Sequence, residues 1–393
     1  MSASERSHAF SARALTAVVF FFWFSQYAFS AYINPMLIRW GASAAFMGLV
    51  NGMYGGAQLA LRIPVGLLAD RYNRQKAFIL AGCVLAFTAA LGLYVSTTPA
   101  QMLLFRTLSG VSACAWVCCT VLYSRCFAAG ESSGRINGLN TVNYLGRLCS
   151  YLVVALVIAQ TDIRTTFLIG AIGGALAVLC CLGVLEIPAR GNGGGFRAYL
   201  AVMRERNLLT CSLLAAAVQF VTFATEYSFS VNVQTALGAS AETINALNIA
   251  LLIPSIAAGA WVSRRLVRGA RPHRFVCAGL MLFALYCFLA TRVPRIGLFF
   301  PLQLLAGVAN ACTIPVLMGQ SVQRIPLEKR STAMGFYQAM YSLGMTFGPM
   351  AMGVLIDHFG YVPSFDAMAC LGLLTCVLTW SLLRRPRGTQ LPA

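Results

Sequence analysis

The sequence predicts an all-α membrane protein in which twelve transmembrane helices form two pseudo-symmetric six-helix bundles. Three observations predict this fold. Apolar residues make up 59% of the chain and charged residues only 10%, whereas soluble domains carry about 25% charged residues. The apolar residues come in blocks of about 20, the length that crosses a hydrocarbon core of about 30 Å. Several short motifs of the first half of the chain recur in the second half.

The apolar blocks define the elements that we expect. Spans are predicted at residues 14–38, 44–69, 77–96, 100–124, 137–159, 165–185, 208–232, 243–263, 275–291, 296–320, 332–356 and 362–383. The first block is too long, and is followed by too many others, to be a cleaved signal peptide. The chain is therefore expected to be a multi-pass protein of the cell membrane, with the lipid bilayer as its solvent.

The distribution of basic residues sets the expected orientation. The net charge is +18, and most of the lysines and arginines fall on one side if both termini are cytoplasmic. The opposite side then holds only Arg39, Arg164, Arg292 and Arg295. This imbalance follows the positive-inside rule, which places both termini in the cytoplasm. The basic excess therefore orients the chain and contacts anionic headgroups, and it does not indicate a nucleic-acid partner.

The longest hydrophilic stretch divides the chain into two expected bundles. Residues 186–207 contain Gly191-Asn192-Gly193-Gly194-Gly195 and several arginines, as a flexible basic connector would. Six predicted spans lie on either side of it. We therefore expect an N-terminal bundle at 1–185, a cytoplasmic linker at 186–207 and a C-terminal bundle at 208–393.

An internal repeat supports this division. When the chain is shifted by 197 residues, Gly41-Ala42-Ser43 falls on Gly238-Ala239-Ser240, and Gly110 falls on Gly307. Both coincidences occur at matching places in the two halves. A duplicated six-helix bundle of this kind packs about an axis along the membrane normal, with a solute site at midplane between the halves.

The turn from Gly66 to Lys76 carries the clearest motif. Its sequence, Gly66-Leu67-Leu68-Ala69-Asp70-Arg71-Tyr72-Asn73-Arg74-Gln75-Lys76, holds an acid and three bases, which hydrocarbon does not tolerate. The turn therefore marks a membrane surface. Read only from its charges, it is a basic loop that fixes topology.

The same turn resembles the loop between the second and third helices of major facilitator superfamily transporters. The resemblance implies their fold and a cytoplasmic gate, in which Asp70, Arg71 and Arg74 latch the loop against the eleventh helix. Gly66 takes the close-packing position of this gate. Asn73 replaces the glycine that is usual in the family, and asparagine tolerates left-handed backbone better than most residues.

Ionisable residues inside the spans are candidate site residues, because each costs roughly 2.5–3.5 kcal/mol on insertion scales. They are Arg62, Arg106, Arg147 and Glu226. The repeat places Gln303 opposite Arg106, Gly344 opposite Arg147 and Phe29 opposite Glu226, so these charges are not duplicated. A scaffold needs its small residues in both halves, whereas a bound solute needs one copy of its anchors.

The expected roles of these residues follow from their chemistry. Arg147, with its neighbours Asn143 and Tyr144, and Arg106 are expected to bind a substrate carboxylate, sulfonate or phosphate, which match the planar guanidinium. Glu226 is expected to take part in binding and to carry a proton. The alternative for Arg147 and Glu226 is a structural ion pair. Arg62 is expected to support the gate or to extend to the membrane surface.

A family pattern adds to the expectation for Arg106. Arg106-Thr107-Leu108-Ser109-Gly110 resembles the R-x-x-x-G pattern in the fourth helix of many facilitators. The resemblance implies a role in proton coupling or in the central polar network. Span 5, in contrast, has Gly146-Arg147 where family antiporters carry a glycine-proline motif.

The expected function is secondary active transport of a small organic anion by alternating access, coupled to protons. The alternative is efflux of drugs or metabolites by proton antiport. An enzyme is not expected, because no Ser-His, metal-His or carboxylate-pair arrangement occurs, and no P-loop occurs either. The 14 cysteines lack zinc-ligand spacing with histidine, so neither a metal nor a cofactor is expected. We expect a monomer, and the short tails suggest a bacterial inner membrane.

Overall fold

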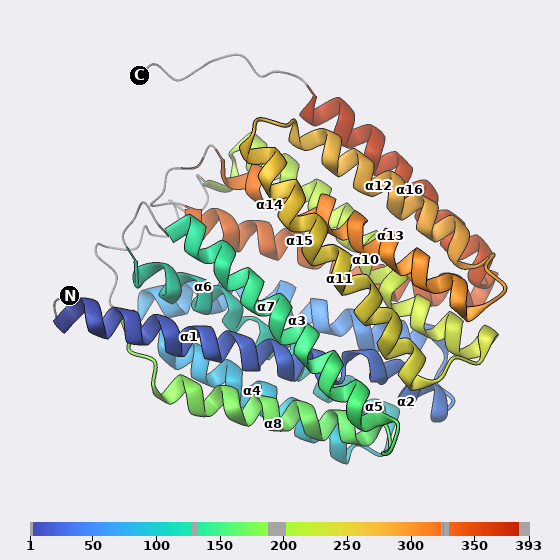
Figure 1. The fold of residues 1–393 in the computed structure, drawn as a ribbon, viewed down its shortest axis with the longest axis horizontal. Coiled ribbons are helices and arrows are strands. Elements are labelled where there is room, and N and C mark those ends of the chain that lie inside the picture. The colour runs from blue at the N-terminus through green and yellow to red at the C-terminus, as the bar shows by residue number, and fades with distance from the viewer. Residues whose placement is uncertain (1–2, 128–131, 188–201, 324, 326–329, 385–393) are drawn as a thin grey trace.

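The computed structural model describes residues 3–127, 132–187, 202–323, 325 and 330–384, and the account below concerns these residues. Helices are the only regular secondary structure among them. The predicted all-α fold of twelve transmembrane helices in two pseudo-symmetric bundles is confirmed. In Figure 1 the helices of the first half lie below those of the second half.

The helices closely match the predicted spans. The first half contains α1 (Ala3–Ala28), η1 (Ser30–Tyr32), α2 (Ile33–Arg39), α3 (Ala44–Arg71), α4 (Gln75–Val95), α5 (Pro99–Ala113), α6 (Ala115–Arg125), α7 (Ser132–Ile158) and α8 (Arg164–Leu182). The second half contains α10 (Arg206–Leu237), α11 (Ala241–Val267), α12 (Pro272–Ala290), η2 (Ile296–Leu298), α13 (Phe299–Cys312), α14 (Ile314–Val322), α15 (Arg330–Phe359) and α16 (Tyr361–Leu383). Most of the predicted linker lies outside the described residues.

Eleven of the described stretches are long and apolar enough to cross a membrane. The twelfth membrane helix is α3, which spans 28 residues and carries Asn51, Gln58 and Arg62 in its middle. These polar residues lower its hydropathy. They are tolerated because α3 packs along α15 of the other half instead of facing lipid over its whole length.

Three predicted spans are interrupted instead of forming single helices. The first span breaks into α1 and α2 around η1, the fourth breaks at Cys114, and the tenth breaks at Thr313. The last two breaks occupy equivalent places in the two halves. Pro315 follows the break at Thr313 within the first turn of α14, whereas Cys114 has no proline after it and gave no sequence signal.

The predicted repeat is present in three dimensions. Gly41 and Gly238 both end a helix with left-handed backbone, at φ 69° and 63°. The serines two residues later, Ser43 and Ser240, cap the next helices through bonds to Phe46 N and Thr243 N. These serine side chains accept from the N–H group three residues on, as an N-cap does.

The matching glycines inside the helices also serve the same purpose in both halves. A Cβ on Gly110 would collide with the carbonyl oxygen of Tyr54, and a Cβ on Gly307 with that of Leu251. Tyr54 and Leu251 are themselves equivalent under the shift of 197 residues. Glycine lets the two backbones of each pair approach closely, as in other membrane helix contacts.

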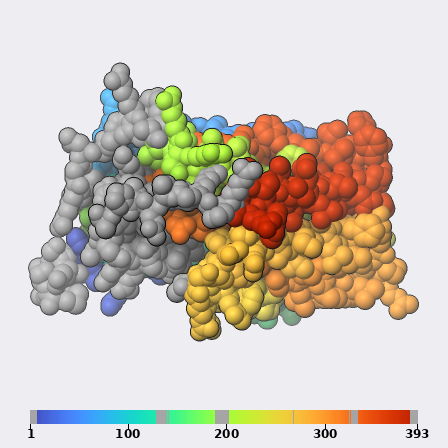
Figure 2. Space-filling view, turned by 90° about the horizontal axis from the view of Figure 1, so that it is seen from above, coloured from blue at the N-terminus to red at the C-terminus, as the bar shows by residue number. Residues whose placement is uncertain are grey.

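The two halves meet along α3 and α15, and again along α7 and α11. We call the end of the bundle that holds Ala3 and Leu383 the terminal end, and the end that holds Arg39 and Phe359 the far end. The terminal end lies on the left of Figure 1. The outer surface is apolar: Figure 2 shows α12 and α16 side by side on one face, where Leu285, Phe288 and Val377 are exposed.

Candidate functional site

A cavity of about 80 Å³ lies between the two halves. This volume has room for roughly six water molecules, at about 10–15 Å³ each. The first half contributes α1, η1, α2, α3, α5 and α7 to its wall, and the second half contributes α10, α11 and α15. Its charged lining residues are Arg106 and Glu226, and its aromatic lining residues are Tyr27, Tyr54, Tyr151, Phe223, Tyr227 and Phe229.

Arg106 lies in α5, the first part of the predicted fourth span, and α5 packs against α3. Its guanidinium carbon is 4.2 Å from the centroid of the Tyr54 ring, and Nη1 lies 3.5 Å from Ser109 Oγ. The Arg106 Nε atom is buried without a hydrogen-bond partner. The tyrosine face offsets part of the cost of the buried charge. Arg106 lines the cavity and forms no ion pair with a described acid, so its charge is available to an anion there.

Arg147 lies in α7 and stacks on aromatic rings. Its guanidinium carbon is 3.8 Å from the centroid of Tyr27 and 5.8 Å from that of Tyr144. The Arg147 Nε atom is also buried without a partner. Arg147 reaches the cavity through Tyr27, which is a lining residue. Of the two arginines, Arg106 therefore has the more direct access to a solute.

Glu226 lies in the middle of α10 and faces the cavity. Its side chain is exposed, although α10 is buried on most sides, because the cavity opens against it. Arg147 and Arg106 are close enough to act on Glu226 electrostatically. Glu226 nevertheless forms no ion pair with any described residue. The structure therefore does not contain the alternative, a structural ion pair between Arg147 and Glu226.

The two remaining predicted substrate residues lie beside Arg147. Tyr144 packs its ring near the Arg147 guanidinium, and Asn143 holds a buried Oδ1 atom without a hydrogen-bond partner. The structure brings both to the same part of α7, but the cavity wall is formed by Tyr151 of that helix. Both stay predictions as substrate-binding residues.

Polar side chains join the two halves at the far-end side of the cavity. Asn34 donates to Ser230 Oγ at 2.9 Å and to the Tyr227 carbonyl oxygen at 3.2 Å. Asn51 donates to Asn34 Oδ1 at 2.7 Å. The bonds of Asn34 link α2 to α10 across the two halves, and Asn51 connects α3 to this link.

A second contact at the far end involves Asp357 of α15. Its carboxylate accepts from the N–H groups of Ala44, at 3.2 Å, and Ala45, at 2.8 Å, at the start of α3. The N-terminus of a helix has unpaired N–H groups and a partial positive charge, and both favour a carboxylate. Tyr227 adds a bond from its hydroxyl to the Ala44 carbonyl oxygen.

Glycines bring α3 and α15 together beneath this contact. A Cβ on Gly52 would lie 2.5 Å from the Thr346 carbonyl oxygen, and one on Gly55 would lie 2.7 Å from the Met345 carbonyl carbon. Sequence reasoning missed both Asp357 and this seam. The spacing of Gly48, Gly52 and Gly55 in span 2 was the available signal, because small residues one turn apart mark close helix contacts.

Arg62 joins the halves on the terminal-end side of the cavity. It is buried and donates to the Gln338 carbonyl oxygen at 3.1 Å and to Ser342 Oγ at 3.3 Å, both on α15. Its guanidinium carbon also lies 5.5 Å from the centroid of the Tyr341 ring. Arg62 therefore bridges the two halves, and it does not extend to the membrane surface.

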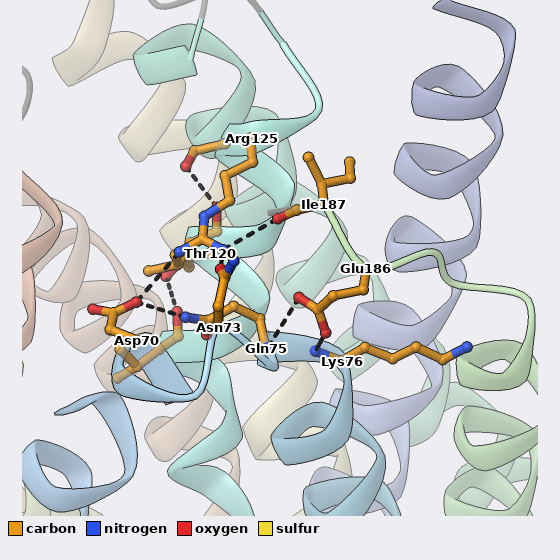
Figure 3. A network of polar contacts seen from close by, with 11 residues as sticks. Asp70, Asn73, Gln75, Lys76, Thr120, Arg125, Glu186 and Ile187 are labelled. Carbon is orange, nitrogen blue, oxygen red and sulfur yellow. Dashed lines mark hydrogen bonds and ion pairs between the residues drawn. The ribbon is translucent and has the colours of Figure 1, made fainter. Parts of the chain in front are cut away.

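The predicted gate loop is held by residues of the first half and of the start of the predicted linker (Figure 3). The Asp70 carboxylate accepts from Gln75 Nε2 at 2.6 Å and pairs with Arg125 Nη2 at 3.3 Å. Glu186 accepts from the N–H groups of Gln75, at 3.0 Å, and Lys76, at 2.8 Å. Arg125 also donates to Asn73 and to the Ile187 carbonyl oxygen.

The other predicted gate residues lie at the surface of this loop. Arg71 and Arg74 are exposed. A Cβ on Gly66 would have an ordinary 3.7 Å contact with Val117, so Gly66 is not at a close helix crossing in this structure. Asn73 has left-handed backbone with φ 50°, which confirms the expected conformation. The latch against α15 stays a prediction.

These features define a membrane transporter, with two helical bundles around a central polar cavity. The family model described as the Major Facilitator Superfamily matches residues 15–272 and 234–392. The chain belongs to the Major Facilitator Superfamily. This confirms the family expected from the Gly66–Lys76 turn, and it confirms that the protein is not an enzyme.

The individual proteins that this chain resembles share little of its sequence. The chain is 25% identical over 338 residues to the multi-drug resistance efflux pump PmrA of Streptococcus pneumoniae, with 81% of each chain covered. Among solved structures, a bacterial homolog of the human lysosomal transporter Spinster, inward-facing and unoccupied, has a TM-score of 0.79 at 15% identity, with 98% of each chain covered. The human organic anion transporter MFSD10 has a TM-score of 0.70 at 16% identity, covering 96% of this chain and 100% of that one. These structures share the fold.

Proposed function

We propose that this transporter moves a small organic anion by alternating access and couples its movement to protons. The observation that carries the proposal is the state of Arg106. It is a permanently charged residue that lines the cavity, has a buried donor without a partner, and rests on a tyrosine ring instead of a carboxylate. A solute with a carboxylate, sulfonate or phosphate would pair with this charge in the cavity.

Glu226 is the proposed proton-carrying group. It is the acid in the lining of the cavity, it is exposed there, and it lies within electrostatic reach of Arg106 and Arg147. A carboxylate in this position changes the charge of the cavity when it binds or releases a proton. Arg147 is proposed as a second anion anchor that a solute reaches when Tyr27 moves.

The proposed movement uses the two halves as units. Residues 1–185 and 208–393 rock against each other, with residues 186–207 as the linker, and the protein acts as a monomer. The positive-inside distribution of arginines supports a cytoplasmic terminal end. In that orientation the contact between Asp357 and α3 closes the outer side of the membrane, and the Gly66–Lys76 turn belongs to the cytoplasmic gate.

A thermal-shift screen of the purified protein tests the proposal. Organic anions should raise the melting temperature, because a ligand that binds only the folded state stabilises it by mass action. Neutral sugars and large hydrophobic cations serve as comparison compounds. Stabilisation by anions, followed by uptake of the same anion into proteoliposomes that depends on a pH gradient, is the expected result. Stabilisation by cations alone would overturn the anion assignment.

Efflux of drugs or metabolites by proton antiport is the second candidate. Two observations favour it: the 25% identity to a protein named as a multi-drug efflux pump, and the aromatic lining formed by Tyr27, Tyr54, Phe223 and Phe229. Aromatic faces attract large cations as well as apolar rings. Counterflow that is driven only by hydrophobic cations would favour this candidate over anion transport.

A further inference from the structure

The net charge of the groups around the cavity depends on whether Glu226 is protonated. Arg106 and Arg147 contribute two positive charges on the first-half side, and Glu226 contributes one negative charge on the second-half side. With Glu226 ionised the group is positive by one charge, and with Glu226 protonated it is positive by two. The acid therefore sets how strongly the cavity attracts an anion.

Glu226 acts on the cavity as a free charge and not as half of a contact pair. It forms no ion pair with a described residue, although Arg147 and Arg106 both act on it electrostatically. An anion that binds Arg106 must share the same small cavity with Glu226. The ionised carboxylate repels that anion, and proton binding removes the repulsion.

The other groups that face Glu226 keep one charge state over the physiological pH range. They are Arg106 of α5, Arg147 and Tyr151 of α7, Tyr27 of α1 and Tyr286 of α12. Arginine stays charged in proteins, and tyrosine titrates near pH 10 in water. On α15, which also packs against α10, the carboxylate of Asp357 is held at the start of α3. Glu226 is therefore the group whose protonation changes the cavity charge.

We infer that a proton on Glu226 and an organic anion on Arg106 bind together, which makes the transporter a proton–anion symporter. This inference rests on the proposed anion function. If the proton strengthens anion binding, then the anion strengthens proton binding by the same factor, because coupling between two sites is reciprocal. A cationic solute in the same cavity would compete with the proton, which is the behaviour of an antiporter.

Binding to the purified full chain at two pH values tests the inference. The probes are benzoate and methanesulfonate, which are ionised at both pH 5.5 and pH 8, so that a change in affinity reports the protein. We expect the dissociation constant of each probe to be about 5- to 150-fold lower at pH 5.5 than at pH 8, which is the usual range of coupling between two sites. Glu226→Gln should bind with little change between the two pH values. Glu242→Gln, a carboxylate at the start of α11 that is exposed outside the cavity, should keep the wild-type pH dependence.

The outcomes separate this inference from the proposed function. If neither probe binds at either pH, the anion function itself fails. If the probes bind equally well at both pH values, or if Glu226→Gln keeps the pH dependence, anion binding stands and the symport inference is wrong. Should Glu226→Gln fail to fold, proton exchange in weakly buffered wild-type protein decides: uptake of protons on probe binding is expected, and release or no exchange would overturn the inference.

Discussion

The charged residues around the cavity differ from those at the ends of the helices in how they are neutralised. At the ends, bases pair with acids of the same half: Arg39 with Asp162 at 2.8 Å, and Arg292 with Asp366 at 2.7 Å. In the centre, Arg106 and Arg147 stack on Tyr54 and Tyr27.

The difference shows which charges the fold needs for itself. Ion pairs at the ends connect neighbouring helices where water lowers the cost of a charge. A charge in the middle of a membrane protein is costly, and such residues usually face a cavity and mark a solute or proton pathway. A tyrosine ring compensates an arginine only in part. The central arginines thus keep hydrogen-bonding capacity that the end arginines have used.

The largest expected effect is on anion binding by Arg106→Gln. Loss of a charge-assisted hydrogen bond costs about 1.5–3 kcal/mol, so the dissociation constant of a bound organic anion should rise about 10- to 150-fold. Arg292→Gln is the matched control, because it removes an arginine of the same size from an ion pair outside the cavity, and it should bind normally. Isothermal titration of both variants checks the contrast. Equal affinity in wild type and Arg106→Gln would remove Arg106 from the binding site.

The next effect concerns Asp357, which joins the halves by capping a helix instead of pairing with a base. Asp357→Asn loses one of two acceptor oxygens, and loss of a cap costs about 0.5–2 kcal/mol. The far end should then open more often. Asn248 of α11 lines the cavity. Labelling of Asn248→Cys by a membrane-impermeant maleimide should be about 2- to 30-fold faster from the far end.

The control for this labelling experiment is Asp366→Asn, which changes an acid of the second half that pairs within its own half. It should leave the labelling rate of Asn248→Cys unchanged. If Asp357→Asn also leaves the rate unchanged, the contact with α3 does not determine closure of the far end.

A smaller effect is expected when Arg147 loses its aromatic support. Tyr27→Leu removes the ring that lies 3.8 Å from the guanidinium, and a cation–π contact contributes about 0.5–2 kcal/mol. The melting temperature should fall by a few degrees, and Tyr27→Phe should restore most of it because phenylalanine keeps the ring. A Tyr27→Phe variant as unstable as Tyr27→Leu would assign the effect to the hydroxyl group instead.

The smallest effect is expected at the Arg39–Asp162 ion pair, whose side chains are both about half exposed. The hydrogen bond from Arg39 lowers the pKa of Asp162 below its ordinary value. Its stabilisation is therefore present above about pH 4, the unfolded pKa, and is lost as the pH falls through the lower folded value. Asp162→Asn should cost less than about 1 kcal/mol at pH 7. Thermal unfolding at pH 7 and below pH 4 should show the difference between wild type and variant disappear in acid; a difference that persists in acid would contradict the ion-pair explanation.

Much of the fold follows from local sequence signals. The length of each apolar block fixed where the helices run, and the repeated Gly-Ala-Ser motif predicted two equivalent caps that both formed. Asn73 was expected to keep left-handed backbone, and it does, with φ 50°. The breaks at Cys114 and Thr313 could not be placed, since they depend on how neighbouring helices pack.

The site was predictable only in part. The cost of burying charge identified Arg106 and Glu226, and both line the cavity. The surroundings of Arg147 were not foreseen, because Tyr27 comes from a different helix and an aromatic residue in a span carries no signal of its partner. The bonds of Asp357 to Ala44 and Ala45 join segments more than 300 residues apart, so only the packed structure brings them together.

The most direct test of the central claim is an experimental structure of the protein with a bound organic anion identified by the thermal-shift screen. The account predicts that the acidic group of the anion lies in the central cavity, with its oxygen atoms about 2.7–2.9 Å from the guanidinium nitrogens of Arg106 or Arg147, as charge-assisted bonds require. An anion bound outside this cavity, or one whose acidic group points away from both arginines, would contradict it.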